Sequence, residues 1–464
     1  MAELRPNDVT ASSSGRSAAG SASADRGRSA APGRSKSAFS VPAYRLYWAS
    51  QLASGIGTWA QSIAQSWLVL QMTGSPFALG TITTLQFLPM MVFPLIGGVI
   101  ADRLPRRRLL IATQTGAMIQ ALVLGALVWS GRVQYWEVGA LALTLGLTNA
   151  FGNPAQQALV PEIVGPGLVG NAVALNSIQF NVARLFGGAV GGVAVAVLGI
   201  SPTLFLNALS YIPAIAVLLS IRPAHSRVSR PAAGHVGTQV SAGLRYALGD
   251  RSIRRTLALF GVVGLLGFNW SVATPLLAVS LGAGAAGFGT LMSAFGAGSL
   301  LAGIALMRSG EVSERRLAVG GLALGAILVL LGLSPVYGVG LALMVTAGLA
   351  GVTASVSANT RLQLLATDEY RGRVMSLFVL LMGGTTPIGA LLLGSIAEAW
   401  GIKTGLVIFG ALTAAGIALI LVADRNGEPV RNVNRDGHPG HALPATIEPS
   451  RTPAPAPATS LAEE

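Results

Sequence analysis

Long stretches without charge make up most of this chain, and short polar or basic segments separate them. A helix that crosses the ~30 Å hydrocarbon layer of a membrane needs about 20 predominantly apolar residues. The runs are 46–101, 109–131, 138–161, 163–221, 256–307, 317–360, 374–397 and 404–423, and only 163–221 contains a charge, Arg184. Four runs are long enough for two helices and contain a glycine or proline turn signal, at Thr73–Pro76, Gly199–Pro202, Gly282–Gly284 and Ser334–Pro335. The pattern therefore predicts an all-α membrane protein with twelve transmembrane helices.

The basic residues predict the orientation of these helices. Loops on the cytoplasmic side of a membrane carry an excess of Lys and Arg. Of the 31 basic residues, 28 lie in the two tails and in alternate loops, whereas only Arg132 and Lys403 lie in the loops between them. We therefore expect a multi-pass protein of a bacterial cytoplasmic membrane with both termini in the cytoplasm.

The twelve predicted helices divide into two halves of six. We expect a disordered cytoplasmic tail at 1–43, a six-helix bundle at 44–222, a cytoplasmic linker at 223–252, a second bundle at 253–424 and another disordered tail at 425–464. Three matches at nearly one offset indicate an internal repeat: Gly98 with Gly303, Glu162 with Asp368, and Gly191-Gly192 with Leu393-Gly394. Two pseudo-symmetric halves with sites between them are typical of secondary transporters.

Composition excludes several classes of protein. Apolar residues make up 52% of the chain and charged residues 11%, whereas a soluble domain carries about 25% charged residues. The net charge of +13 is explained by basic loops, so no nucleic-acid partner is expected. There is no cysteine, and the four histidines, His225, His235, His438 and His441, lie in polar segments. No metal, no cofactor and no enzyme activity are therefore expected.

Several short motifs resemble those of the major facilitator superfamily over about residues 40–423. The stretch 98–107 matches its motif between the second and third helices at Gly98, Asp102, Arg103, Arg106 and Arg107. Three further segments resemble the enterobactin-exporter-like branch, known as transmembrane secretion effectors, namely 371–377, Thr73–Pro76 and Pro161-Glu162. The resemblance implies a secondary transporter that exports a small amphipathic metabolite, siderophore or drug by alternating access. We expect a monomer, in the lipid bilayer, with a small-molecule substrate and a coupling ion such as H⁺.

Two loops contain candidate residues for a cytoplasmic gate. Their charges could pair across the boundary between the halves in one state and separate in the other. The residues are Gly98, Asp102, Arg103, Arg106, Arg107, Asp368, Glu369, Arg371 and Arg373. The alternative is that the first loop only fixes the orientation of the chain and that the second only caps a helix.

A second group of residues could line a substrate cavity, because polar side chains inside a membrane face protein or water. These residues are Gln51, Ser54, Thr58, Gln61, Gln65, Arg184, Asn269 and Trp270. The first five recur at spacings of three and four and so lie on one helical face. The alternatives are hydrogen bonds between helices, core packing and, for Arg184, bonds to helix carbonyls and to Asn181.

No Asp or Glu falls in the middle of a predicted span, although proton-coupled transporters usually have such an acid. The sequence therefore does not identify the coupling ion. An importer or facilitator of the same fold, or a receptor or scaffold that does not transport, also fits the sequence.

Overall fold

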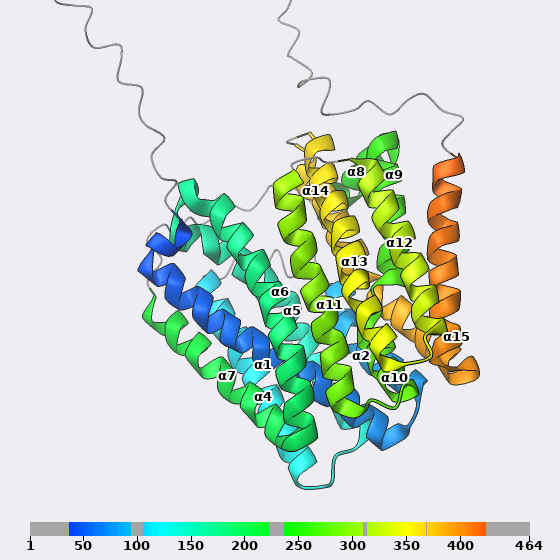
Figure 1. Cartoon of the computed structure of the whole chain (residues 1–464). Coiled ribbons are helices and arrows are strands. Elements are labelled where there is room, and N and C mark those ends of the chain that lie inside the picture. The colour runs from blue at the N-terminus through cyan, green and yellow to red at the C-terminus, as the bar shows by residue number, and fades with distance from the viewer. Residues whose placement is uncertain (1–36, 94–104, 222–235, 310–312, 368, 424–464) are drawn as a thin grey trace, which may run out of the picture. The chain divides into compact units, whose positions relative to one another are not determined.

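The computed structural model describes residues 37–93, 105–221, 236–309, 313–367 and 369–423, and the regular elements within these ranges are all helical (Figure 1). The first half of the chain forms η1 (Ala38–Ser40), α1 (Pro42–Thr73), α2 (Pro76–Val92), α4 (Arg106–Trp129), α5 (Tyr135–Val164), η2 (Pro166–Leu168), α6 (Val169–Val197) and α7 (Ile200–Ser220). We call these helices the N-half.

The second half begins with α8 (Val236–Gly249), which lies in the segment expected to be a linker. It continues with α9 (Arg251–Val262), η3 (Val263–Gly267), α10 (Trp270–Ser280), α11 (Gly284–Ser309), α12 (Glu314–Leu333), α13 (Tyr337–Leu365), α14 (Arg371–Val379), η4 (Leu380–Gly384) and α15 (Thr386–Ala423). We call the helices from α9 onward the C-half.

All four turn signals in the long runs separate two helices, as predicted. Gly74 ends α1 with a positive φ of 62°, and its N–H is bonded to the Leu70 carbonyl. The Ser75 side chain then caps α2 by accepting from the Ala78 N–H. A further break occurs inside α15, where Gly401 adopts a φ of 80° that favours glycine.

The twelve predicted membrane helices all appear in this order. Eight helical stretches are long and apolar enough to cross a membrane, and one of them, Arg371–Ala423, contains two spans on either side of Gly401. The remaining spans are α1, the shorter apolar helix α2 and α5. A helix satisfies most of its backbone hydrogen bonds internally, which is what a hydrocarbon environment demands.

Two places show irregular helix geometry that the sequence pattern did not predict. The elements η3 and η4 are π-helical and interrupt the seventh and eleventh spans. They lie against each other, because a Cβ added to Gly264 of η3 would meet the carbonyl oxygen of Leu381 in η4. π-Helical turns bend a helix and are frequent at functional sites.

The most extensive contacts between the two halves are those of α6 with α11 and of α2 with α15, and α1 and α2 also touch α10, α11 and η4. Glycines let the backbones approach closely, as small residues do in membrane proteins. In the α6–α11 seam, a Cβ on Gly192 would lie 2.8 Å from the Cα of Gly289. In the α2–α15 seam, a Cβ on Gly394 would lie 2.9 Å from the carbonyl oxygen of Pro76. The neighbouring helices can be followed in Figure 1, where α11 runs between α6 and α13.

We name the two ends of the bundle by charge. The basic end is the one at which α1, α4, α12 and α14 begin, and the far end is the one at which α2 and α11 begin. The expected tails, apart from residues 37–43, lie outside the described residues, as does most of the loop that contains Gly98, Asp102 and Arg103.

Candidate functional site

An ion pair joins α4 to α5 at the basic end of the N-half. Arg106 Nη1 lies 2.7 Å from Glu162 Oε1, and the two side chains are 17% and 10% exposed. The neighbouring Arg107 donates to the carbonyls of Leu218 and Leu219 at the end of α7. These two predicted gate arginines therefore hold helices of their own half together in this structure.

A second charged cluster lies at the basic end of the C-half, and sequence reasoning did not single it out. Glu314 at the start of α12 lies 2.9 Å from Arg255 Nε of α9 and 2.9 Å from Arg361 Nη2 of α13. Arg361 Nε also donates to Thr256 Oγ1 at 3.0 Å. The three charged side chains are between 8% and 15% exposed. One acid therefore serves two partly buried arginines.

The two clusters occupy equivalent places with opposite charge order. In the N-half the base is on the third span (Arg106) and the acid on the fourth (Glu162). In the C-half the acid is on the third span of the half (Glu314) and the base on the fourth (Arg361). An alignment of the two halves does not reveal that the clusters correspond, because the equivalent helix ends carry charges of opposite sign: Arg106 and Glu314 begin the third spans, and Glu162 and Arg361 lie near the ends of the fourth spans.

The remaining predicted gate residues lie around the start of α14. Arg371 Nε donates to the Gln363 carbonyl at 3.2 Å, and the Arg373 guanidinium lies 4.9 Å from the centre of the Tyr370 ring. Tyr246 of α8 stacks on the same ring, with 4.3 Å between the ring centroids. Glu369 is exposed beside this cluster. Asp368 lies outside the described residues.

The polar face of α1 points at neighbouring helices of the N-half. Ser54 is buried, at 4% exposure, and its backbone carbonyl accepts a hydrogen bond from Thr58. The other four residues bond to side chains on α2, α4 and α7. These bonds are Gln51–Gln114 (3.0 Å), Thr58–Tyr211 (3.0 Å), Gln61–Gln120 (2.9 Å), Gln61–Asn207 (2.5 Å) and Gln65–Gln86 (3.1 Å). In this structure these groups form a polar network between helices.

Arg184 lies in the middle of α6, where the two halves meet. Its Nη2 donates to Asn181 Oδ1 at 3.1 Å and to Ser299 Oγ of α11 at 2.8 Å. Among the described residues no acid pairs with it. Placing Arg at the centre of a membrane helix costs about 2.5–3.5 kcal/mol on insertion scales. The contacts of Arg184 that offset this cost are two neutral acceptors and nearby aromatic rings.

Asn269 and Trp270 stand at the point where the seventh span is broken. After η3, Phe268 and Asn269 leave the helical conformation, with φ/ψ of −107°/28° and −90°/39°. Asn269 Oδ1, Trp270 Nε1 and Thr274 Oγ1 are all buried without a hydrogen-bond partner in the described structure. Unpartnered polar atoms at a broken membrane helix are a feature of substrate sites in transporters.

At the far end, an exposed carboxylate joins the two halves. Glu398 Oε2 of α15 accepts from Ser75 Oγ at 2.7 Å and from the Phe77 N–H at 3.1 Å, at the first turn of α2. The Phe77 N–H and the Ser75 hydroxyl hold the pKa of Glu398 below its ordinary value of 4.5. Deeper in the same seam, Thr84 Oγ1 donates to the Pro387 carbonyl at 2.9 Å.

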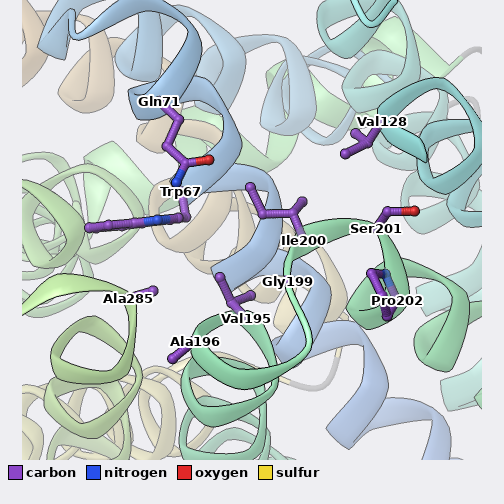
Figure 2. Close-up of a pocket in the computed structure, with 10 residues that line it drawn as sticks. All are labelled: Trp67, Gln71, Val128, Val195, Ala196, Gly199, Ile200, Ser201, Pro202 and Ala285. Carbon is purple, nitrogen blue, oxygen red and sulfur yellow. The ribbon is translucent and has the colours of Figure 1, made fainter. Parts of the chain in front are cut away.

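One pocket of about 560 Å³ opens near the far end of the N-half (Figure 2). Trp67 and Gln71 of α1 line one side, and Gly199 to Pro202, at the turn between α6 and α7, line another. Ala285 of α11 is its only contribution from the C-half among the described residues. The predicted cavity residues are not part of its wall.

Comparison with known families supports the resemblance inferred from the motifs. The transmembrane secretion effector family matches residues 34–454. The staphyloferrin A transporter of Staphylococcus aureus (strain NCTC 8325 / PS 47) is 24% identical over 381 residues, 80% of this chain and 93% of that protein. The multidrug efflux pump Tap of Mycolicibacterium fortuitum is 27% identical over 387 residues, 80% and 92%. The enterobactin exporter EntS of Escherichia coli (strain K12) is 25% identical over 396 residues, 83% and 93%.

Solved structures share the fold at low sequence identity. The nucleoside transporter NupG superposes with a TM-score of 0.67 at 12% identity and covers 82% of this chain and 98% of its own. A bacterial homolog of the human lysosomal transporter Spinster, inward-facing and unoccupied, gives a TM-score of 0.63 at 12% identity, with coverage of 82% and 95%. The predicted twelve-helix transporter fold is confirmed.

Proposed function

Since this chain belongs to the transmembrane secretion effector family of the major facilitator superfamily, we propose that it exports a small amphipathic metabolite, siderophore or drug. The substrate classes named for the staphyloferrin A transporter, Tap and the enterobactin exporter support this range. The transport mode is alternating access, in which two halves rock about a site between them. We propose the monomer as the transporting unit.

The observation that carries this proposal is the uneven contact between the halves. Within the described ranges, Glu398, Thr84, Ser293 and Arg184 form hydrogen bonds between the halves, at the far end or at mid-level. At the basic end, the described pairs Arg106–Glu162 and Arg255–Glu314 each lie within one half. A bundle that is joined at one end and separately braced at the other is suited to opening at the second end.

We further propose that the basic end faces the cytoplasm, because most Lys and Arg residues lie there. The structure would then be the state that accepts substrate from the cytoplasm. In the opposite state, the charged loops around Asp102 and Asp368 would meet across the halves as the gate. Asp102, Arg103 and Gly98 belong to this proposal on sequence grounds, together with Arg106, Arg107, Glu369, Arg371 and Arg373.

A counterflow assay tests the transport activity without knowledge of the coupling ion. The purified chain is reconstituted in lipid vesicles loaded with an unlabelled compound, and the entry of the labelled compound is followed. A panel of siderophores and cationic and anionic drugs provides the candidates. We expect transient accumulation of at least one compound, which protein-free vesicles do not show. A receptor or scaffold would give no counterflow with any of them.

A further inference from the structure

Arg184, in the middle of a span, differs from the three arginines that form ion pairs at the basic end. Arg106 has Glu162 as its acid, and Arg255 and Arg361 share Glu314. Arg184 instead donates only to the neutral oxygens of Asn181 and Ser299. Its positive charge is therefore not neutralised by any described residue.

The guanidinium of Arg184 also keeps unused donors. Its Nε is buried without an acceptor, and no described residue accepts from Nη1. A guanidinium offers five N–H groups in a planar fork that matches a carboxylate. The free donors of the Arg184 guanidinium thus have no negatively charged acceptor, and an anionic ligand would supply one.

Three aromatic rings surround this charge. The Arg184 Cζ atom lies 4.7 Å from the ring centre of Phe295, 5.6 Å from that of Phe180 and 5.7 Å from that of Trp59. The rings come from α1, α6 and α11, so both halves contribute. Flat faces around a guanidinium provide stacking surfaces for a ligand that is itself flat.

A second unused donor belongs to Trp270, which packs against the same Phe295 ring. Trp270 packs against Phe295 with ring centroids 4.7 Å apart, and its Nε1 is buried without an acceptor. Trp270 begins α10 directly after the break in the seventh span. Phe295 therefore lies between Arg184 and the broken seventh span. Both Arg184 and Trp270, which contact its ring, have N–H groups without an acceptor.

Packing around Arg184 is looser toward the basic end. Its partner Ser299 is fully buried, whereas a Cβ placed on Gly303, one turn nearer the basic end, would meet no atom within 4 Å. On α6, Phe180 is 55% exposed one turn nearer the same end.

We propose that Arg184 binds the anionic group of a flat aromatic substrate, such as an aromatic carboxylate or phenolate, and that Trp59 and Phe180 stack against its ring, while the fully buried Phe295 packs beneath the guanidinium. This inference rests on the proposed function, of which it names the substrate class. Because Ser299 belongs to the other half, an anion that takes over the Nη2 donor weakens a bond across the seam. Binding of the anion is thereby linked to movement of the halves.

The test measures binding to the purified full-length chain in detergent, so it does not depend on transport. The probes are 2-naphthoate, its neutral amide 2-naphthamide and the saturated acid decahydronaphthalene-2-carboxylate. We expect 2-naphthoate to bind about tenfold more tightly than either of the other two, because only it combines a charge with a flat ring. Arg184→Gln should abolish the preference for the acid over the amide, and Arg184→Lys should keep part of it. Arg308→Gln, which changes an exposed arginine of the same helix as Ser299, should leave it unchanged.

A measurement on the unaltered protein covers the case in which the variants do not fold. Phenylglyoxal modifies accessible guanidinium groups, and mass spectrometry reports the extent at Arg184. We expect 2-naphthoate to protect Arg184 and 2-naphthamide not to. Equal binding of acid and amide, binding of neither, or a preference that Arg184→Gln retains would overturn the inference. Binding as expected without any counterflow would contradict the proposed function alone.

Discussion

At the scale of single residues, the arginines of the two ion-pair clusters at the basic end have an acid, whereas Arg184 in the middle of a span has none among the described residues. Glu314 illustrates the first kind, because it serves Arg255 and Arg361 within 2.9 Å of each. Removing one partner of a buried pair leaves the other charge uncompensated, which is far more destabilising than the net value of the pair. Arg184 illustrates the second kind and depends on neutral acceptors and rings.

Glu314→Gln should therefore lower the stability of the C-half. We expect a loss of about 1–3 kcal/mol, because two partly buried arginines would keep their charges without an acid. The measurement is the apparent melting temperature of the purified protein in detergent. The matched control is Glu369→Gln, which changes an exposed carboxylate at the same end of the bundle. Equal melting temperatures for the two variants would show that the cluster does not stabilise the fold.

At the scale of helices, close approach across the α6–α11 seam depends on glycine. A Cβ on Gly289 would meet the carbonyl oxygen of Gly188 and, at 2.6 Å, the Cα of Gly192. Gly289→Ala should destabilise the protein by about 1–3 kcal/mol, the usual cost of overpacking. Gly303→Ala on the same helix has open space and should be neutral or stabilising by up to about 1 kcal/mol. Thermal unfolding of both variants checks this, and an equal effect of the two would mean that the seam is not tightly packed.

The α2–α15 seam should respond to acid through Glu398. Its pKa lies below 4.5 while it is bonded to Ser75 and Phe77, so protonation favours the state in which these bonds are broken. The contact is fully stabilising above the ordinary pKa of 4.5 and is lost as the pH falls through the lowered value. The chain has no cysteine, so Thr84→Cys provides a single reporter within this seam.

We expect the reporter cysteine to react faster with a membrane-impermeant thiol reagent as the pH is lowered from 7 through the lowered pKa of Glu398, below 4.5. Each rate is compared with that of the same reagent and a small free thiol at the same pH. Adding Glu398→Gln should make labelling fast at pH 7 and remove the dependence on pH. A pH profile that is unchanged by Glu398→Gln would exclude the carboxylate as the cause.

The positions of the helices along the chain could be predicted from the sequence far better than the contacts between helices. Charge-free runs and Gly/Pro signals such as Gly74 and Gly199 are local, and a membrane leaves helices as the only way to satisfy the backbone in these runs. The π-helical turns were not predictable, because Gly264 and Leu381 meet only in the folded protein. The helix α8 was missed because its 14 residues lack an uncharged run of membrane length.

For the candidate site, the sequence identified residues but not their contacts. Spacing placed Gln51 and Gln61 on one face of α1. Only the structure shows that they form hydrogen bonds with Gln114 and Gln120 of α4. Arg184 was recognisable as the lone charge within a span. Its rings were not, because Trp59 and Phe295 are far from it in the chain and apolar residues in helices carry no pairing signal.

At the scale of the whole molecule, the direction of transport follows from which end opens. The two halves are joined at the far end and by Arg184 at mid-level, and we propose that they accept substrate from the basic end and that this end is cytoplasmic. An importer of the same fold would have the same helices and seams. The direction of transport is therefore decided by a measurement on membrane vesicles of known orientation.

The most direct test is substrate accumulation in membrane vesicles of defined orientation from cells that express the chain. The compound is the one that gives counterflow, and respiration energises both preparations. We predict accumulation in inside-out vesicles, in which export leads inward, and none above empty-vector membranes in right-side-out vesicles. Accumulation in right-side-out vesicles alone would contradict the account and make the protein an importer.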